Sequence, residues 1–109
     1  MAYDEKLAGR IREILPAQHD LVEKKMFGGV AYMLHGNMSC GVHGNRLIVR
    51  LGAERHAAAM AEAHTLPFDF SGRPMAGWVM VEPEGCASEE DLVRWVQKGV
   101  DYALSLPPK

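Results

Sequence analysis

Alternating apolar and polar residues between Val22 and Leu51 indicate an antiparallel sheet. The apolar segments are separated by glycine-containing turns at residues 28–29, 35–37 and 43–45. Glycine reaches positive φ without a Cβ clash and asparagine tolerates it, so these residues favour tight turns. The spacing predicts a four-stranded meander over this region.

The period of two in a strand sorts side chains onto the two faces of the predicted sheet. We expect Met38, Cys40 and Val42 to share the apolar face, while Ser39 and His43 point to a solvated face. Residues 30–34 are apolar on both faces. This pattern predicts a central strand that is covered on both sides or lies at a subunit contact.

Two helices flank the predicted sheet. Asp4 is a candidate N-cap for a first helix, which Pro16 ends. Ser88, followed by acidic residues, is a capping-box signature for a last helix, which ends before Pro107. The apolar positions at helical spacing are Leu7, Ile11, Ile14 and Leu15 in the first helix, and Leu92, Trp95, Val96, Gly99 and Ala103 in the last.

The residues between the meander and the last helix predict one more helix and one more strand. Residues 53–63 have helical propensity, with an expected apolar stripe at Ala53, Ala57, Met60 and Ala61. Prolines and a glycine in residues 64–74 argue against regular structure, and we expect Phe68 and Phe70 to anchor this loop. Residues 75–82 predict a last strand. The fold prediction is a single α+β domain over residues 1–109, with about five antiparallel strands in the order α-β-β-β-β-α-β-α.

Composition excludes several classes of protein. The 109 residues are 48% apolar and 24% charged, as in an ordinary globular domain. No apolar segment approaches the ~20 residues of a membrane-spanning helix, and no export signal precedes the first helix, so we expect a cytoplasmic protein without membrane association. The net charge of −2 makes direct nucleic-acid binding an unfavoured interpretation.

The cysteines and histidines do not form a recognisable chemical motif. Cys40 and Cys86 lack a neighbouring cysteine partner, and we expect buried free thiols without a catalytic role. The five histidines lack the ligand spacing of structural zinc sites. Ser39 and His43 form an i, i+4 pair on one face of the predicted strand, which is more typical of a strand face than of a catalytic dyad. We therefore predict no catalytic residue, no metal and no cofactor.

Two glycine motifs resemble the N-terminal domain of the TfoX/Sxy family. The first is Met26-Phe27-Gly28-Gly29, and the second is Gly72-Arg73-Pro74-Met75-Ala76-Gly77-Trp78. The resemblance spans nearly the whole chain and implies a small secretion-chaperone-like α+β domain. Longer members are regulators of natural competence, thought to act with the cyclic-AMP receptor protein at promoters. This sequence ends at Lys109, so we expect a stand-alone N-terminal domain without the second, helical domain. The structural motif residues are Met26, Phe27, Gly28, Gly29, Pro74, Met75, Gly77 and Trp78.

These observations predict a non-enzymatic protein-interaction module, resembling an accessory factor in transcription regulation. The alternative is a small-molecule-binding domain or an uncharacterised enzyme, which a convergent polar pocket would favour. We also expect a two-fold homodimer through an apolar patch formed by Ala31, Met33 and Ile48. An open alternative is that residues 64–74 cover this patch within one chain.

Overall fold

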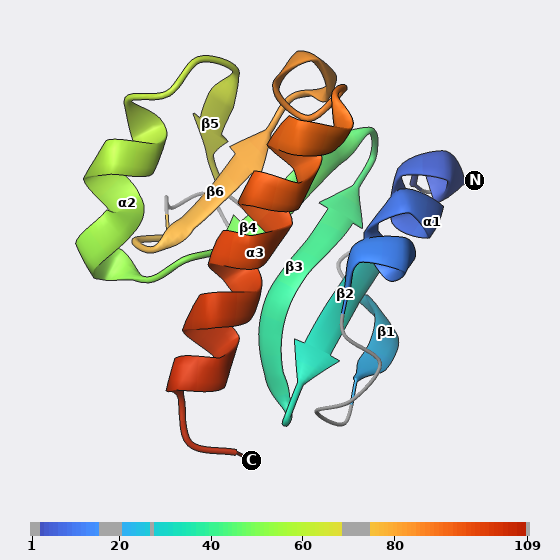
Figure 1. Ribbon diagram of the computed structural model, residues 1–109, viewed down its shortest axis with the longest axis vertical. Helices are drawn as coiled ribbons and strands as arrows, with labels where there is room; N and C mark the ends of the chain where they lie inside the picture. Colours follow the sequence, from blue (N-terminus) through green and yellow to red (C-terminus); the bar gives the residue numbers. More distant parts are fainter. Residues whose placement is uncertain (1–2, 16–20, 27, 69–74, 109) are drawn as a thin grey trace.

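The computed structural model describes residues 3–15, 21–26, 28–68 and 75–108. Within these residues, one antiparallel six-stranded sheet has the order β1-β2-β3-β4-β6-β5. The strands are β1 (Val22–Met26), β2 (Gly29–Leu34), β3 (Asn37–His43), β4 (Arg46–Arg50), β5 (Thr65–Pro67) and β6 (Trp78–Val81). The helices are α1 (Glu5–Ile14), α2 (Ala53–Met60), the short 3-10 helix η1 (Pro83–Gly85) and α3 (Glu89–Ser105). Helices α1 and α3 cover one face of the sheet, and α2 stands beside the end that carries β5 and β6 (Figure 1).

The predicted α+β class and the meander β1 to β4 are confirmed, with one additional strand. We expected no regular structure in residues 64–74, but Thr65–Pro67 pairs with β6 as an edge strand. Proline lacks an N–H for a ladder and is therefore tolerated at a sheet edge. The sheet of the described residues has six strands instead of about five because Thr65–Pro67 adds an edge strand, where Pro67 is tolerated.

Helix α1 is anchored at both its cap and its buried face. The carboxylate of Asp4 accepts hydrogen bonds from the N–H groups of Lys6 and Leu7, as the predicted N-cap requires. The buried hydroxyl of Tyr32 donates to the carbonyl of Ala8 at 3.1 Å. Burial raises the pKa of Tyr32, so this donor keeps its proton. The apolar stripe of the first helix is therefore held to β2 by packing and by one buried hydrogen bond.

A bulge in β3 changes which side chains share a face. Tyr32 pairs with Cys40, but Met33 pairs with Met38, so Ser39 is an additional residue in β3. The hydroxyl of Ser39 donates to the carbonyl of Tyr32 at 2.9 Å. Cys40 lies in the core beneath the helices, whereas Met38 lies on the opposite face. Our expectation that Met38 and Cys40 share a face was wrong because the bulge reverses the alternation.

The second face of the sheet is apolar and partly covered, where we expected a solvated face. Ala31, Met38 and Ile48 form a buried cluster there with Phe68, which follows β5. Ser39, expected on a solvated face, is fully buried. The alternative that the loop after β5 covers this face is thus confirmed for Phe68, whereas Phe70 lies outside the described residues.

Helix α2 faces the sheet with a different side from the one we expected. Ala59 is its buried residue, and His56 and Met60 are partly buried beside it. Ala53, Ala57 and Ala61 are exposed. Alanines occur all round this helix, so the apolar pattern does not define one face, and the contacts with β5 and β6 decide which side is buried.

Helix α3 confirms the predicted cap and apolar stripe. Its buried residues are Leu92, Trp95, Val96, Gly99, Val100 and Ala103. Gly99 lies against β3, because a Cβ at this position would collide with the carbonyl oxygen of Ser39. The missing side chain lets the helix backbone approach the bulge. None of the described helices is long and apolar enough to cross a membrane.

Replacing Ser88 with alanine is expected to lower the free energy of unfolding by about 1 kcal/mol. The Ser88 hydroxyl accepts from the N–H of Asp91 at 3.1 Å, and alanine leaves this N–H without its acceptor. Urea denaturation followed by circular dichroism measures the effect. Ser88→Asp supplies another good cap and should unfold within a few tenths of a kcal/mol of the wild type. Equal losses in both variants would contradict the capping role.

Candidate functional site

Two glycines join the start of β6 to the connection between β4 and α2. The carbonyl of Gly77 accepts hydrogen bonds from the N–H groups of Leu51 at 2.9 Å and Gly52 at 3.2 Å. Both glycines have positive φ, 91° at Gly52 and 88° at Gly77. A Cβ on Gly77 would lie 2.9 Å from the carbonyl carbon of Gly52. The glycine in the second motif is therefore required by backbone conformation and by close approach.

His56 completes this junction from α2. Its Nδ1 accepts a hydrogen bond from the N–H of Gly77 at 3.0 Å, which corresponds to a neutral imidazole with its proton on Nε2. Sequence analysis did not identify this role. A single histidine in an alanine-rich helix has no motif, and its partner lies far along the chain.

Arg50, at the end of β4, lies between two aromatic rings. Its guanidinium carbon is 5.2 Å from the ring centroid of Trp78 and 5.3 Å from that of Tyr102. Each cation–π contact contributes about 0.5–1 kcal/mol where the groups are partly exposed. Trp78 of the second motif is therefore linked through Arg50 to α3.

A surface pocket of about 430 Å³ opens beside Tyr102. We call it the Gly52 pocket; it is lined by residues 51–55, Asp101, Tyr102 and Ser105. A Cβ at Gly52 would meet the Tyr102 ring at 2.6 Å, so the glycine allows the ring to lie against the start of α2. The pocket carries two acidic side chains, Glu54 and Asp101, and one basic side chain, Arg55.

Two polar groups of the Gly52 pocket already have hydrogen-bond partners within α3. The Ser105 hydroxyl donates to the carbonyl of Tyr102 at 2.6 Å, so its proton is directed at the backbone and not at a general base. Asp101 accepts from the side-chain amide of Gln97 at 2.8 Å. Such groups can hold a small polar molecule by hydrogen bonds and charge.

The second face of the sheet forms a larger candidate surface, which we call the methionine face. It consists of buried Ala31, Met38, Ile48 and Phe68 and of partly exposed Met33, Trp78 and Met80. The rings of Phe68 and Trp78 stack with centroids 5.6 Å apart. Partly exposed methionines beside an aromatic pair are typical of adaptable protein-binding surfaces.

The patch that we expected at a dimer contact is mostly inside the chain. Ala31 and Ile48 are fully buried, because Phe68 packs over them. Met33 remains partly exposed. The expectation that all three present an exposed patch was therefore wrong, and Met33 is the one of them that a partner can reach in this structure.

The motif residues are divided between two places. Met26 is 40% exposed on β1, while Gly28 and Gly29 form the turn into β2. Met75 is 36% exposed, and Gly77 and Trp78 lie at the junction beside Arg50. Phe27 and Pro74 lie outside the described residues. The described residues of the two motifs therefore do not meet in one site.

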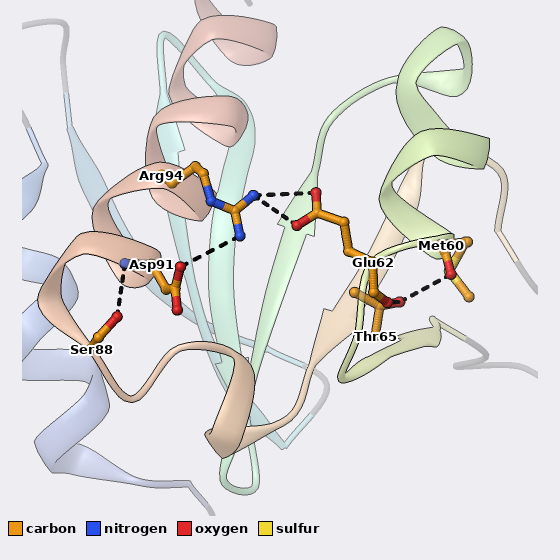
Figure 2. Close-up of polar contacts among 6 residues, drawn as sticks. All are labelled: Met60, Glu62, Thr65, Ser88, Asp91 and Arg94. Atoms are coloured by element: carbon orange, nitrogen blue, oxygen red, sulfur yellow. Dashed lines mark hydrogen bonds and ion pairs between the residues drawn. The ribbon is translucent and has the colours of Figure 1, made fainter.

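Helix α3 is also tied to the segment after α2. Figure 2 shows Arg94 reaching from α3 to Glu62, with an ion pair at 2.9 Å, and to Asp91 at 3.7 Å. The hydroxyl of Thr65 donates to the carbonyl of Glu62 at 2.8 Å and so orders the same segment. These charged groups are exposed by a third or more, and such pairs contribute at most about 1 kcal/mol. These contacts hold α3 next to the segment after α2.

Both cysteines are expected to resist thiol reagents at pH 8 in the folded protein. Cys40 is fully buried, and burial raises the pKa of its thiol to about 12. Burial also raises the pKa of the Cys86 thiol. At pH 8 the thiolate fraction of Cys40 is then about a thousandfold below that of an ordinary exposed cysteine. Labelling with iodoacetamide followed by mass spectrometry should modify neither residue until urea is added.

The same burial predicts how stability depends on pH. Because the folded thiol of Cys40 holds its proton more tightly than the unfolded one, its contribution to stability is complete below pH 9 and decreases as pH rises towards 12. Rapid modification of Cys40 at pH 8 with an intact circular dichroism spectrum would contradict this account.

The described residues contain no cluster of three or more His, Cys, Asp or Glu side chains able to hold a metal ion.

Comparison with known families identifies the domain. The profile of the TfoX N-terminal domain matches residues 13–103. The chain belongs to the TfoX N-terminal domain family. The matched residues include all six strands of the described sheet and both glycine motifs, so the resemblance seen in the sequence is confirmed. No curated protein and no solved structure matches the chain.

Proposed function

We propose that this TfoX N-terminal domain is a non-enzymatic, cytoplasmic protein-interaction module that binds a partner protein through the methionine face. The observation that carries the proposal is the buried apolar cluster with partly exposed Met33 on one side of it and partly exposed Met80 and Trp78 on the other. Unbranched methionines change rotamer at low cost and can fit a partner surface, and the stacked rings of Phe68 and Trp78 add a rigid part to the same face.

The surroundings of the methionine face support a protein partner. Val22 is 52% exposed and Met26 is 40% exposed on β1, next to the strand that carries Met33. Apolar side chains on neighbouring strands can form one contact surface, and such surfaces mark protein interfaces more often than single apolar residues do. Burial of both thiols and the backbone-directed proton of Ser105 support a role without catalysis.

Family membership supports an accessory role in transcription regulation, through contact with a regulator protein. The net charge of −2 favours such a contact over direct binding to DNA. A gel shift on random duplex at increasing salt tests the DNA alternative, because contacts to phosphates weaken steeply with salt. A salt-sensitive shift at micromolar protein would contradict the proposal.

The partner can be identified by quantitative pull-down from host lysate with wild-type protein and two variants. Met33→Glu places a charge on the methionine face. Leu104→Glu is the matched control, because Leu104 is 38% exposed on α3, away from this face. We expect one protein to be retained by the wild type and by Leu104→Glu, and reduced at least tenfold with Met33→Glu.

Binding measurements with purified proteins then test whether the methionine face is the contact surface. The candidate partner should bind the wild type directly and lose affinity with both Met33→Glu and Met80→Glu, while circular dichroism shows that the variants are folded. Equal binding of all variants would show that the methionine face is not the contact surface.

The Gly52 pocket favours a second candidate function, binding of a small polar molecule. Its volume of about 430 Å³ is within the range of ligand pockets, and it has acidic and basic groups at its rim. Thermal-shift screening against common metabolites tests this function. A ligand that raises the Tm of the wild type but not of Tyr102→Ala would support it over the protein-interaction role.

A further inference from the structure

We propose that the outer edge of β1, which no other described strand pairs, is a homodimer contact, at which two copies pair antiparallel about a two-fold axis through Lys24. This inference goes beyond the partner proposed for the methionine face and uses a different contact, although Val22 and Met26 border both surfaces. It retains the two-fold dimer expected from the sequence and places its contact on a strand edge, since Ala31 and Ile48 are buried.

Strand β1 is the outermost strand of the described sheet. It pairs with β2 on one side, and all five of its residues are exposed. An edge strand presents unpaired N–H and C=O groups that can bind another strand. A second copy of the same strand satisfies these groups and extends the sheet across the two-fold axis.

The sequence of β1 is complementary to itself in this register. Val22-Glu23-Lys24-Lys25-Met26 paired about Lys24 places Glu23 opposite Lys25 of the second copy, and Val22 opposite Met26 of the second copy. Glu23 and Lys25 thus each meet an opposite charge, and two exposed apolar residues meet each other, whereas Lys24 meets Lys24 at the axis. Because of the two-fold symmetry, each favourable contact occurs twice.

The side chains of β1 also lie on compatible faces. Lys24 pairs with Ala31, and Val22 pairs with Met33, so the apolar residues of β1 lie on the side of the methionine face. Glu23 pairs with Tyr32 and lies on the side of α1. In the dimer, Val22 and Met26 of the two copies would therefore meet on the side of the methionine face. The pairs of Glu23 and Lys25 would form on the side of α1.

Glu23 is held in position before a second copy arrives. Arg12 of α1 donates to its two carboxylate oxygens at 2.6 and 2.9 Å, and this contact lowers the pKa of Glu23. A carboxylate has about four lone-pair sites, so Lys25 of the second copy can bind as well. Within the described residues, Lys25 makes no ion pair of its own.

The two Lys24 side chains oppose the dimer, because like charges meet at the axis. A five-residue edge also buries less than the roughly 1,200 Å² of a stable interface. We therefore expect a weak dimer, with a Kd on the order of 100 µM. This cost makes Lys24 a useful probe, since removing its charge should strengthen the contact.

Sedimentation equilibrium between about 10 µM and about 1 mM protein tests the pairing. We expect reversible dimerisation of the wild type, at least about tenfold weaker dimerisation of Lys25→Glu and about two- to fivefold stronger dimerisation of Lys24→Thr. Lys6→Glu is the matched control, because it makes the same charge change on α1 and should dimerise like the wild type. Monomer at all concentrations, or equal weakening by Lys25→Glu and Lys6→Glu, would overturn the proposal.

The register is tested by cross-linking. Lys24→Cys should form a disulfide-linked dimer under mild oxidation, because the two residues face each other across the axis. Val22→Cys should not, because the two Val22 positions would lie about 13 Å apart along the strands. Equal cross-linking of the two variants would rule out this register, and the buried native thiols serve as internal controls.

Discussion

Replacing Trp95 with alanine is expected to lower the free energy of unfolding by about 3–5 kcal/mol. Trp95 is the largest fully buried side chain and is 1% exposed. It lies on α3 in the core between the helix and the sheet. Truncation removes apolar contacts and leaves a cavity that the surrounding strands cannot fill. Urea denaturation followed by far-UV circular dichroism measures the loss.

Trp78→Ala is the matched comparison for Trp95. Trp78 is partly exposed, and its contacts are the stacked ring of Phe68 and the guanidinium of Arg50. A partly exposed ring loses less on truncation, and we expect about 1–3 kcal/mol. Trp95→Ala would contradict the core assignment if it unfolded within 1 kcal/mol of the wild type.

Replacing Gly29 with alanine is expected to destabilise the domain by about 1–3 kcal/mol, towards the upper end of that range. We expected both glycines of the first motif to require positive φ, but only Gly28 has it, at 74°. Gly29 is required for another reason. A Cβ there would collide with the carbonyl oxygen of Val42 and lie 3.2 Å from the Cα of His43. These are backbone atoms of β3, which cannot move aside as a side chain could.

Substitutions at Gly28 separate the effect of positive φ from the effect of a steric collision. No atom lies within 4 Å of a Cβ at Gly28, so alanine should cost only the conformational energy of positive φ, about 1–2 kcal/mol. Asparagine tolerates this conformation, and Gly28→Asn should be less destabilised than Gly28→Ala. At Gly29, asparagine should be no better than alanine. Thermal melting compares the four variants, and a Gly29→Ala protein with the wild-type Tm would remove the steric explanation.

The elements of this fold are visible in the sequence wherever a local rule determines them. Asp4 and Ser88 act as caps because the geometry of a helix start is local. The glycine turns are set in the same way by backbone conformation. The face assignment of Met38 failed because the additional residue Ser39 reverses the alternation, and a bulge has no reliable local signal.

The candidate surfaces were less predictable because they depend on contacts between distant residues. The second motif pointed to Gly77 and Trp78, but Arg50, His56 and Tyr102 became associated with them only through the tertiary structure. The apolar pattern of β2 correctly indicated a strand covered on both faces. The pattern could not show whether Phe68 or a second subunit covers the strand, because burial by either one requires the same apolar residues.

The contact between Gly99 and the Ser39 bulge sets the position of α3 along its own axis. At Gly99 the helix backbone lies close to β3, and sliding the helix by one residue would bring a Cβ against the Ser39 carbonyl. One turn further along α3, Tyr102 lies over Arg50 and forms a wall of the Gly52 pocket. The position of this pocket wall therefore depends on the bulge in β3, and a change in the bulge would alter a pocket that it does not touch.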